Sequence, residues 1–327
     1  MAIKDKISWG ILGCGDVAEV KSGPAFQKCE NSQLLAVMRR NSAKAEDFAM
    51  RHEVPLWYDD ADELLQNKDI NAVYIATPPA SHLEYTLKTI KAGKDIYLEK
   101  PMTRTADEAQ QILNALAKSK VKLTVAHYRR KLSAFLKVKE LLKNDSIGNV
   151  RFAKIEILQP LKSDIIAKTE ENWRVEPELS GGGYFYDLAP HQLDLMAHFF
   201  GPVESMHGFS KNQAADYDAA DIVNGVVSFK NGVQLQGLWC FNVAEKDKQD
   251  QCIIYGSEGT ITFSFYGGEV ILDSNSKKEI FHFDQIPHVQ QPLIQATVDY
   301  FLGNAENPCP PQAGLTVMQM LEGMSGS

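Results

Sequence analysis

Residues 7–18 read ISWGILGCGDVA, and this stretch decides how the N-terminal part of the chain is interpreted. Its first half is short and mostly apolar, as in a strand buried within a sheet. Its second half has the spacing G-x-G-x-x-A, and a helical pattern follows. In that setting the first glycine permits a tight turn, the second lets the main chain approach a pyrophosphate, and the alanine lets helix and strand pack closely. The stretch therefore predicts a dinucleotide-binding turn, and the alternative is a glycine-rich structural turn.

The residues of this turn are the expected contacts to the dinucleotide, because backbone N–H groups at the start of a helix bind an anion. They are Gly13, Cys14, Gly15, Asp16 and Val17. Further short apolar runs follow at 33–38, 72–76, 95–98 and 122–126, with helical patterns between them. Strands that alternate with helices predict an α/β fold, a doubly wound parallel sheet of the Rossmann type, with residues 1–126 as its domain.

The end of the second predicted strand indicates which dinucleotide binds. A domain that binds NAD usually has Asp or Glu there for the ribose hydroxyls, whereas this chain has Arg39 and Arg40. Guanidinium groups suit a 2′-phosphate because they form paired, charged hydrogen bonds with it. The sequence therefore favours NADP over NAD, and the alternative is a solvated basic turn before a helix.

Alternation of polar and apolar residues dominates the rest of the chain, after a linking helix expected at 131–143. It is strict at 260–265, and Asn231 and Gly232 are an expected hairpin turn. A two-residue period predicts strands with one buried face. We expect residues 127–327 to form an α+β domain with an open, mostly antiparallel sheet that helices cover on one side. The last helical pattern, at 312–324, is a candidate to return to the first domain.

Lysine follows one of the predicted buried strands, in the tripeptide Glu99-Lys100-Pro101. Open α/β sheets bind ligands at the carboxyl ends of their strands. A lysine placed there beside a nicotinamide can donate a hydrogen bond to the reacting oxygen and stabilise charge on it. The alternative is a surface Glu-Lys pair at a strand end.

Asp187 and His191 are four residues apart in a helix expected from Tyr184 to Phe200, after three glycines. This spacing places both side chains on one helix face, where Asp187 can orient His191 as a general base. Asp194 continues the same stripe. Metal ligation is an alternative for these residues, but no second cluster completes a ligand shell, so we expect no metal. A structural histidine among apolar neighbours is the other alternative.

Four motifs in this order resemble the Gfo/Idh/MocA oxidoreductase family over nearly the whole chain. They are GCGDVA at 13–18, ATPPASH at 76–82, EKP at 99–101 and GGGYFYDLAPH at 181–191. The resemblance implies a Rossmann domain, a second domain for substrate binding and oligomerisation, and a nicotinamide at the cleft between them. It also implies that Lys100, Asp187 and His191 are catalytic and that the Lys100–Pro101 bond is cis. Further residues expected near the cofactor are Thr77, Pro78, His82, Glu99, Trp173 and Arg174.

The function that these features predict is NADP-dependent hydride transfer between nicotinamide and a carbon–oxygen centre of a sugar, polyol or related diol. A redox-neutral glycosidase that retains its nicotinamide is an alternative within the family. A non-catalytic NADP-sensing regulatory protein is another, although members of that kind can lack the lysine or histidine that this chain has.

Composition excludes several other classes of protein. The chain has 327 residues, which suits two domains, and its net charge of −8 argues against a general nucleic-acid or membrane surface. Its five cysteines form no C-x-x-C pair, so we expect a reducing cytoplasmic location. The resemblance implies a homodimer or homotetramer.

Overall fold

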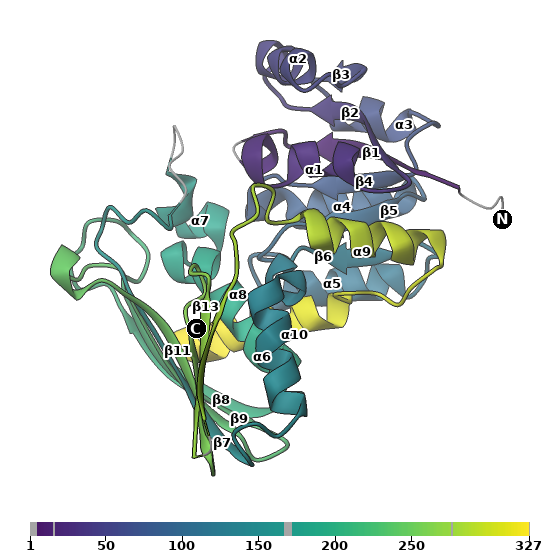
Figure 1. The fold of residues 1–327 in the computed structure, drawn as a ribbon. Coiled ribbons are helices and arrows are strands. Elements are labelled where there is room, and N and C mark those ends of the chain that lie inside the picture. Colours follow the sequence, from purple (N-terminus) through teal and green to yellow (C-terminus); the bar gives the residue numbers. More distant parts are fainter. Residues whose placement is uncertain (1–4, 16, 167–171, 276, 327) are drawn as a thin grey trace. The chain divides into compact units, whose positions relative to one another are not determined.

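A six-stranded parallel sheet forms the centre of the first of two units into which the chain divides (Figure 1). This unit contains Met1–Arg129 and Ile286–Leu315, and the second contains Arg130–Gln285 and Thr316–Ser327. The structure is a computed structural model, and the residues that it describes are 5–15, 17–166, 172–275 and 277–326. Each unit is treated by itself below.

The strands of the first sheet lie in the order β3-β2-β1-β4-β5-β6, and all neighbours are parallel. Their bounds are β1 Ile7–Leu12, β2 Ser32–Met38, β3 Leu56–Tyr58, β4 Ala72–Ile75, β5 Asp95–Leu98 and β6 Leu123–Val125. This order confirms the predicted doubly wound sheet. The direction of winding reverses between β1 and β4, so their carboxyl ends form the edge where such sheets bind ligands. Only β3 was not predicted, because it is three residues long and largely exposed.

Helices connect these strands and cover the sheet (Figure 1). The principal ones are α1 Gly23–Lys28, α2 Ser42–Arg51, α3 Ala61–Gln66, α4 His82–Lys91, α5 Ala106–Leu116 and α9 Gln291–Leu302. A short π-helix, η1 (Ala18–Ser22), precedes α1 and directly follows the glycine-rich turn. The segment near the C-terminus that belongs to the first unit, Ile286–Leu315, therefore contains α9. The sequence had pointed only to a later helix, at 312–324, as a candidate to return to this unit.

An aromatic cluster fixes α9 to the sheet. Trp9 on β1 contacts Phe26 on α1 and Phe301 on α9, with ring centroids 4.8 and 5.7 Å apart. Tyr74 on β4 and Tyr97 on β5 lie 5.3 Å apart in the same cluster. All but Phe301 are completely buried, and aromatic rings contribute large apolar areas to a core. This packing brings the segment that precedes α9 next to the end of β5.

The second unit contains an eight-stranded sheet in the order β14-β13-β12-β11-β7-β10-β9-β8. The pair β7–β10 is parallel and the other neighbours are antiparallel, which confirms the predicted open, mostly antiparallel sheet. The bounds are β7 Val150–Leu158, β8 Val203–Lys211, β9 Ile222–Phe229, β10 Gln234–Cys240, β11 Gln249–Gly256, β12 Gly259–Phe263, β13 Glu269–Ser274 and β14 Lys278–His282. The expected hairpin turn at Asn231 and Gly232 joins β9 to β10, and Gly232 has a φ of +87°.

The strand predicted at 260–265 is shorter than expected, because β12 ends at Phe263. The main-chain N–H groups of Phe265 and Tyr266, beyond the end of the strand, donate to the carboxylate of Asp250 at 3.0 and 2.8 Å. These side-chain hydrogen bonds replace the ladder that a longer strand would need. Polar and apolar alternation alone could not reveal this exchange.

Helices pack on one face of this sheet (Figure 1). They include α6 Ser133–Lys143, the short α7 Pro177–Ser180 and α8 Gly183–Phe200, and α10 (Pro311–Ser325) begins in the first unit and ends in the second. Most of α8 is buried, and it ends at Phe200, before Gly201, whose φ is +87°. Among the described residues, no helix is both long and apolar enough to cross a membrane.

Candidate active site

The glycine-rich turn joins the carboxyl ends of three strands in the first unit. The N–H groups of Gly13 and Cys14 both donate to the carbonyl of Met38, at 2.9 and 3.2 Å, which ties the end of β1 to that of β2. Gly13 has a φ of +92°, and a Cβ there would lie 2.8 Å from the nitrogen of Thr77, which follows β4. Glycine is therefore required at residue 13 both by backbone conformation and by close packing.

Gly15, unlike Gly13, faces open space in the protein. A Cβ at this position would meet nothing within 4 Å, and its φ lies outside the left-handed region. Nothing in the described protein therefore demands glycine at residue 15, whereas a pyrophosphate approaching the main chain would. This open position next to the buried Cys14 fits a dinucleotide. Val17 lies just before η1, and the predicted contact Asp16 lies outside the described residues.

Arg39 and Arg40 directly follow β2, at the end of the second strand as predicted. The N–H of Arg39 donates to Tyr58 at 3.2 Å, and its side chain is half-buried while that of Arg40 is exposed. Burial raises the pKa of the Cys14 thiol to about 11, and the positive charge of Arg39 opposes that shift. The guanidinium group therefore acts electrostatically on the glycine-rich turn. The side chain of Asn41 accepts from the N–H of Lys44 at 3.0 Å and caps α2.

His82 connects two loops at the ligand-binding edge. Its Nε2 lies 2.7 Å from the carbonyl of Thr77, after β4, and its Nδ1 lies 3.0 Å from the carbonyl of Pro101, after β5. The ring is completely buried, and burial lowers its pKa. Thr77 is half-buried and Pro78 is exposed. His82 thus braces the loops, and its predicted place by the cofactor remains a prediction.

The loop after β5 has the cis bond between Lys100 and Pro101 that the family resemblance implied. Lys100 is half-buried, whereas Glu99 is almost completely buried. The Glu99 carboxylate accepts a hydrogen bond from the N–H of Lys100 at 3.0 Å and others from Tyr74 and Gln290, each at 2.6 Å. Glu99 therefore anchors the main chain at the predicted catalytic lysine.

Sequence reasoning missed Gln290. It lies 191 residues from Glu99 along the chain, in a region with no motif, and only the fold brings the two side chains together. A buried carboxylate requires hydrogen-bond donors, but the sequence does not show where they come from.

In the second unit, Ser180 and the three glycines shape the start of α8. The Ser180 hydroxyl accepts from the N–H of Gly183 at 3.0 Å. Gly183 has a φ of +74°, and a Cβ there would lie 2.4 Å from that of Ala219. The turn is therefore packed tightly against a neighbouring loop, and it directs α8 so that Asp187 is half-buried and His191 buried.

The acidic residues of α8 pair with arginines. Asp187 accepts from Nε of Arg174 at 3.0 Å, and the Arg174 guanidinium lies 4.5 Å from the centre of the Trp173 ring. One turn beyond His191, Asp194 accepts from Arg130 at 2.8 and 2.7 Å in a bidentate pair. The planar guanidinium group of arginine suits both bidentate pairing and stacking on an aromatic ring. Arg174 thus contacts Asp187, and Trp173 contacts Arg174. The place of Trp173 and Arg174 near the cofactor and the orientation of His191 by Asp187 remain predictions.

These pairings also bear on metal binding. The carboxylates of Asp187 and Asp194 are engaged with guanidinium groups. Within the described ranges, no group of three or more His, Cys, Asp or Glu side chains is arranged to hold a metal ion.

Comparison with known proteins matches each of the two units to a family model. Residues 7–127 match the family model described as "Oxidoreductase family, NAD-binding Rossmann fold". Residues 135–262 match the model described as "GFO/IDH/MocA C-terminal domain". The two matches cover the strands and helices that carry Lys100 and His191, respectively.

Individual relatives extend the match to the whole chain. "Oxidoreductase P35" of Formosa agariphila is 52% identical over 99% of this chain and 100% of its own length. The "scyllo-inositol 2-dehydrogenase (NADP(+)) IolW" of Bacillus subtilis is 30% identical over 60% of this chain and 52% of its own length. A solved levoglucosan dehydrogenase, in complex with NADH and levoglucosan, is similar in fold with a TM-score of 0.85, 18% identity and coverage of 98% and 96%. By its two family domains and its full-length relative, the chain belongs to the Gfo/Idh/MocA family of oxidoreductases.

Proposed function

We propose that the chain is an NADP-dependent dehydrogenase or reductase that acts on a carbon–oxygen centre of a sugar, polyol or related diol. The observation that carries this proposal is Lys100, half-buried after β5 and anchored through Glu99 at the ligand-binding edge of the sheet. The scyllo-inositol dehydrogenase among the relatives, whose name specifies NADP(+), supports both the substrate class and the cofactor.

The cofactor proposal rests on two features of the first unit. Gly15 leaves space where a pyrophosphate would approach the main chain. Arg39 and Arg40 follow β2, where Asp or Glu would favour NAD. Arg39 would hold the 2′-phosphate by charged hydrogen bonds, and exposed Arg40 would add to the local positive potential.

In this proposal Lys100 and His191 carry out the proton transfer and hydrogen bonding at the substrate oxygen. When bound, the nicotinamide supplies or accepts the hydride. In the oxidative direction the ammonium group of Lys100 donates a hydrogen bond to the substrate oxygen and stabilises negative charge that develops on it. Neutral His191 accepts the hydroxyl proton. The proposal requires both groups to act on one substrate molecule.

Asp187 assists His191 in this proposal. Its carboxylate stabilises the imidazolium form that follows proton transfer. The hydrogen bond from Arg174 restrains Asp187, and the stacking of Arg174 on Trp173 restrains the arginine in turn. Trp173 and Arg174 therefore support the general base from outside the reacting atoms.

A panel of cyclic polyols, aldoses and keto-sugars tests the function, with NADP or NADPH followed by nicotinamide fluorescence. We expect net, substrate-dependent reduction or oxidation and tighter binding of NADP than of NAD. Product formation without net change in the nicotinamide would instead indicate a redox-neutral glycosidase. NADP binding without turnover of any substrate in the panel would contradict the proposed activity.

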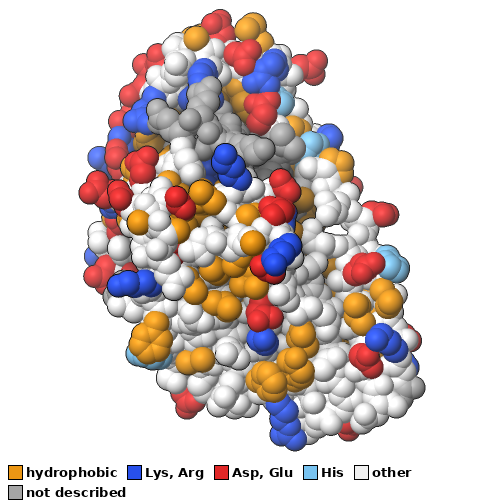
Figure 2. All heavy atoms as spheres, turned by 90° about the vertical axis from the view of Figure 1, so that its left-hand side faces the viewer, with side chains coloured by type: hydrophobic (Ala, Val, Ile, Leu, Met, Phe, Trp, Pro, Cys, Tyr) orange, Lys and Arg blue, Asp and Glu red, His pale blue; other side chains and the backbone are white. Residues whose placement is uncertain are grey.

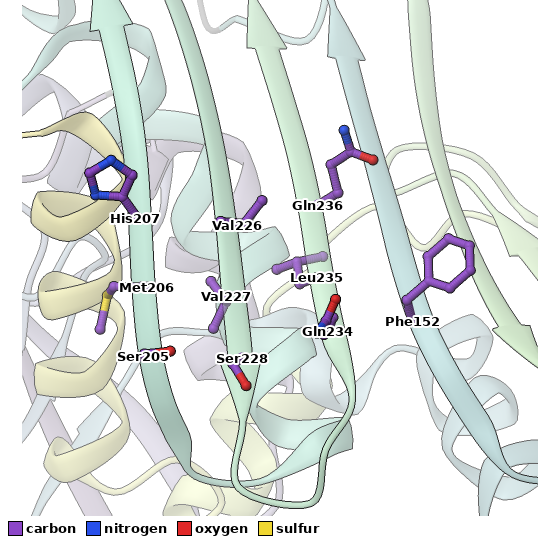
Figure 3. A pocket seen from close by; sticks show the side chains of 10 residues that line it. All are labelled: Phe152, Ser205, Met206, His207, Val226, Val227, Ser228, Gln234, Leu235 and Gln236. Carbon is purple, nitrogen blue, oxygen red and sulfur yellow. The ribbon is translucent and has the colours of Figure 1, made fainter.

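We also propose that the protein is a homo-oligomer through the uncovered face of the large sheet. Phe209, Val226 and Phe152 are 71%, 52% and 40% exposed there. A depression of about 520 Å³ runs across β7, β8, β9 and β10 (Figure 3). Figure 2 shows groups of exposed hydrophobic side chains on the side of the molecule that lies at the left in Figure 1. Exposed apolar patches of this kind mark interaction sites.

Light scattering coupled to size exclusion tests the assembly. We expect the mass of a dimer or tetramer, and Phe209→Lys should shift it toward the monomer because a charge would be buried at the interface. A monomeric wild-type protein would contradict this proposal.

A further inference from the structure

The carboxylate of Glu99 links the main chain at Lys100 to a distant part of the first unit. Its Oε2 accepts from the Lys100 N–H at 3.0 Å. Its Oε1 accepts from the Tyr74 hydroxyl and from Nε2 of Gln290, both at 2.6 Å. Glu99 is only 5% exposed, so these donors take the place of water.

Gln290 is fixed at both ends of its amide. It directly precedes α9, and its side chain is 1% exposed. While its Nε2 donates to Glu99, its Oε1 accepts from the Tyr97 hydroxyl at 2.9 Å. A hydroxyl can donate only to the oxygen end of the amide, so Tyr97 orients the nitrogen end toward Glu99.

The donors to Glu99 differ in origin. Tyr74 belongs to β4 and Lys100 is the second residue after β5, so both belong to the sheet or to the loop that leaves it. Gln290 comes from the C-terminal return segment, which the aromatic cluster around Trp9 and Phe301 packs against the sheet. This segment therefore contributes a hydrogen bond one residue away from the predicted catalytic lysine.

We propose that Gln290 is a positioning residue for Lys100 and acts through Glu99. By restraining one carboxylate oxygen, it fixes the other oxygen, which holds the N–H of Lys100 where the chain leaves β5. The catalytic consequence rests on the proposed role of Lys100. The hydrogen-bond relay itself does not depend on that role.

Kinetics of Gln290→Leu provides the first test, with Gln295→Leu as the matched control. Gln295 lies in the first half of α9, which Gln290 precedes, but it bonds to Glu30 and Asp299 instead of Glu99. We expect Gln290→Leu to lower kcat by up to about a hundredfold, as small misplacements of reacting groups do, with little change in the dissociation constant of NADP. Gln295→Leu should retain the wild-type kcat. Equal kcat values for wild type and Gln290→Leu, or equal losses in both variants, would overturn the proposal.

Gln290→Glu provides a pH-dependent rescue that simple loss of packing would not produce. At low pH the new carboxyl group is protonated and can donate to Glu99 as the amide does. As pH rises, two adjacent carboxylates repel each other, and the relay breaks. We expect kcat relative to wild type to be highest at low pH and to fall as pH rises, whereas Gln290→Leu should be impaired throughout. A ratio for Gln290→Glu that is independent of pH would count against the relay.

The charged and titratable groups around Glu99 do not obscure this profile. Burial raises the pKa of Tyr74 and that of Tyr97 well above their ordinary value, and Glu99 adds to both shifts. Burial lowers the pKa of His82. His288, two residues before Gln290, lies 2.7 Å from Nζ of Lys28. His288, Lys28 and Lys100 are present in both wild type and Gln290→Glu, so the ratio of their kcat values compares proteins with the same neighbouring groups.

Hydrogen exchange separates this inference from the proposed function. The amide of Lys100 should exchange about tenfold faster in Gln290→Leu, the factor expected for loss of roughly one hydrogen bond to a charged group. The amide of Glu99, which donates to Ile75 in the sheet, serves as the internal reference. If no substrate were turned over, the proposed function would be wrong. The exchange rate of the Lys100 amide would still show whether Gln290 acts on Lys100 through Glu99. An unchanged Lys100 exchange rate in folded Gln290→Leu would overturn the relay.

Discussion

The buried pair of Arg130 and Asp194 predicts a large and specific loss of stability. The two side chains are 8% and 1% exposed and form a bidentate contact at 2.8 and 2.7 Å. Asp194→Asn changes the shape of the side chain little but removes its charge. The Arg130 guanidinium would then remain buried without its counter-charge.

The size of the effect follows from that burial. Removing one partner of a buried ion pair costs about 3 to 5 kcal/mol of the free energy of unfolding. For a folding unit of the second unit's size, each kcal/mol lowers the Tm by about 2 to 4 °C. Asp194→Asn should therefore lower the Tm of the second unit by roughly 6 to 20 °C.

Thermal unfolding followed by circular dichroism measures this change, and urea unfolding confirms it. The control is Asp164→Asn, which breaks a pair with Lys248 in which the aspartate side chain is 85% exposed. That change should have a much smaller effect because water screens exposed pairs. Replacing both buried partners, as Arg130→Met with Asp194→Leu, should recover much of the loss. A Tm for Asp194→Asn within 2 °C of wild type would refute the reasoning.

Three further predictions concern the cofactor site and the response to pH. Gly15→Ala should leave the Tm unchanged, because the added Cβ meets open space in the protein. It should weaken NADP binding by about 1 to 3 kcal/mol, because the methyl group would meet the bound dinucleotide. An unchanged NADP affinity would show that the dinucleotide does not approach the main chain at residue 15. Arg39→Asp should weaken NADP binding by about 1.5 to 3 kcal/mol and favour NAD, as titration calorimetry with both cofactors would show; equal wild-type affinities for NADP and NAD would contradict this. Burial, together with the charges of Arg130 and Lys139, lowers the pKa of His198 from 6.5 to about 4. Because the folded protein favours the neutral imidazole, the contribution of His198 to the free energy of unfolding is fully present above pH 6.5 and is lost as pH falls toward 4. His198→Gln should therefore lose less stability between pH 7 and 5 than wild type, measured as the urea midpoint, and parallel losses would show that His198 does not contribute.

The sequence was most informative where local rules act. The glycine-rich turn, the apolar runs of β1, β4 and β5 and the helix from Tyr184 to Phe200 could be predicted because each depends on neighbouring residues. The short edge strand β3 lacks such a pattern, and β12 ends early because Asp250, on another strand, binds the main chain beyond it.

In the candidate site, too, residues in local motifs could be predicted, whereas contacts between distant segments could not. Lys100, Asp187 and His191 could be selected from motifs, and Arg39 from the residue type that β2 lacks at its end. The partners of the buried carboxylates near these residues could not be predicted, because the partners come from distant segments. Gln290 binds Glu99, the residue before Lys100, and Arg130 binds Asp194, one turn beyond His191. A buried charge reveals that a partner is needed, but only the fold identifies it.

Single-residue variants at Lys100 and His191 test the central claim most directly. In the proposed reaction both groups take part in proton transfer and hydrogen bonding at the substrate oxygen, while the dinucleotide is held by the glycine-rich turn and Arg39. The decisive measurement is kcat on a confirmed sugar or polyol, with the dissociation constant of NADP, for folded Lys100→Met and His191→Asn. We expect each change to lower kcat by roughly 10²- to 10⁴-fold while NADP binds almost as in wild type. Turnover near the wild-type rate in either folded variant would contradict the catalytic role of that residue.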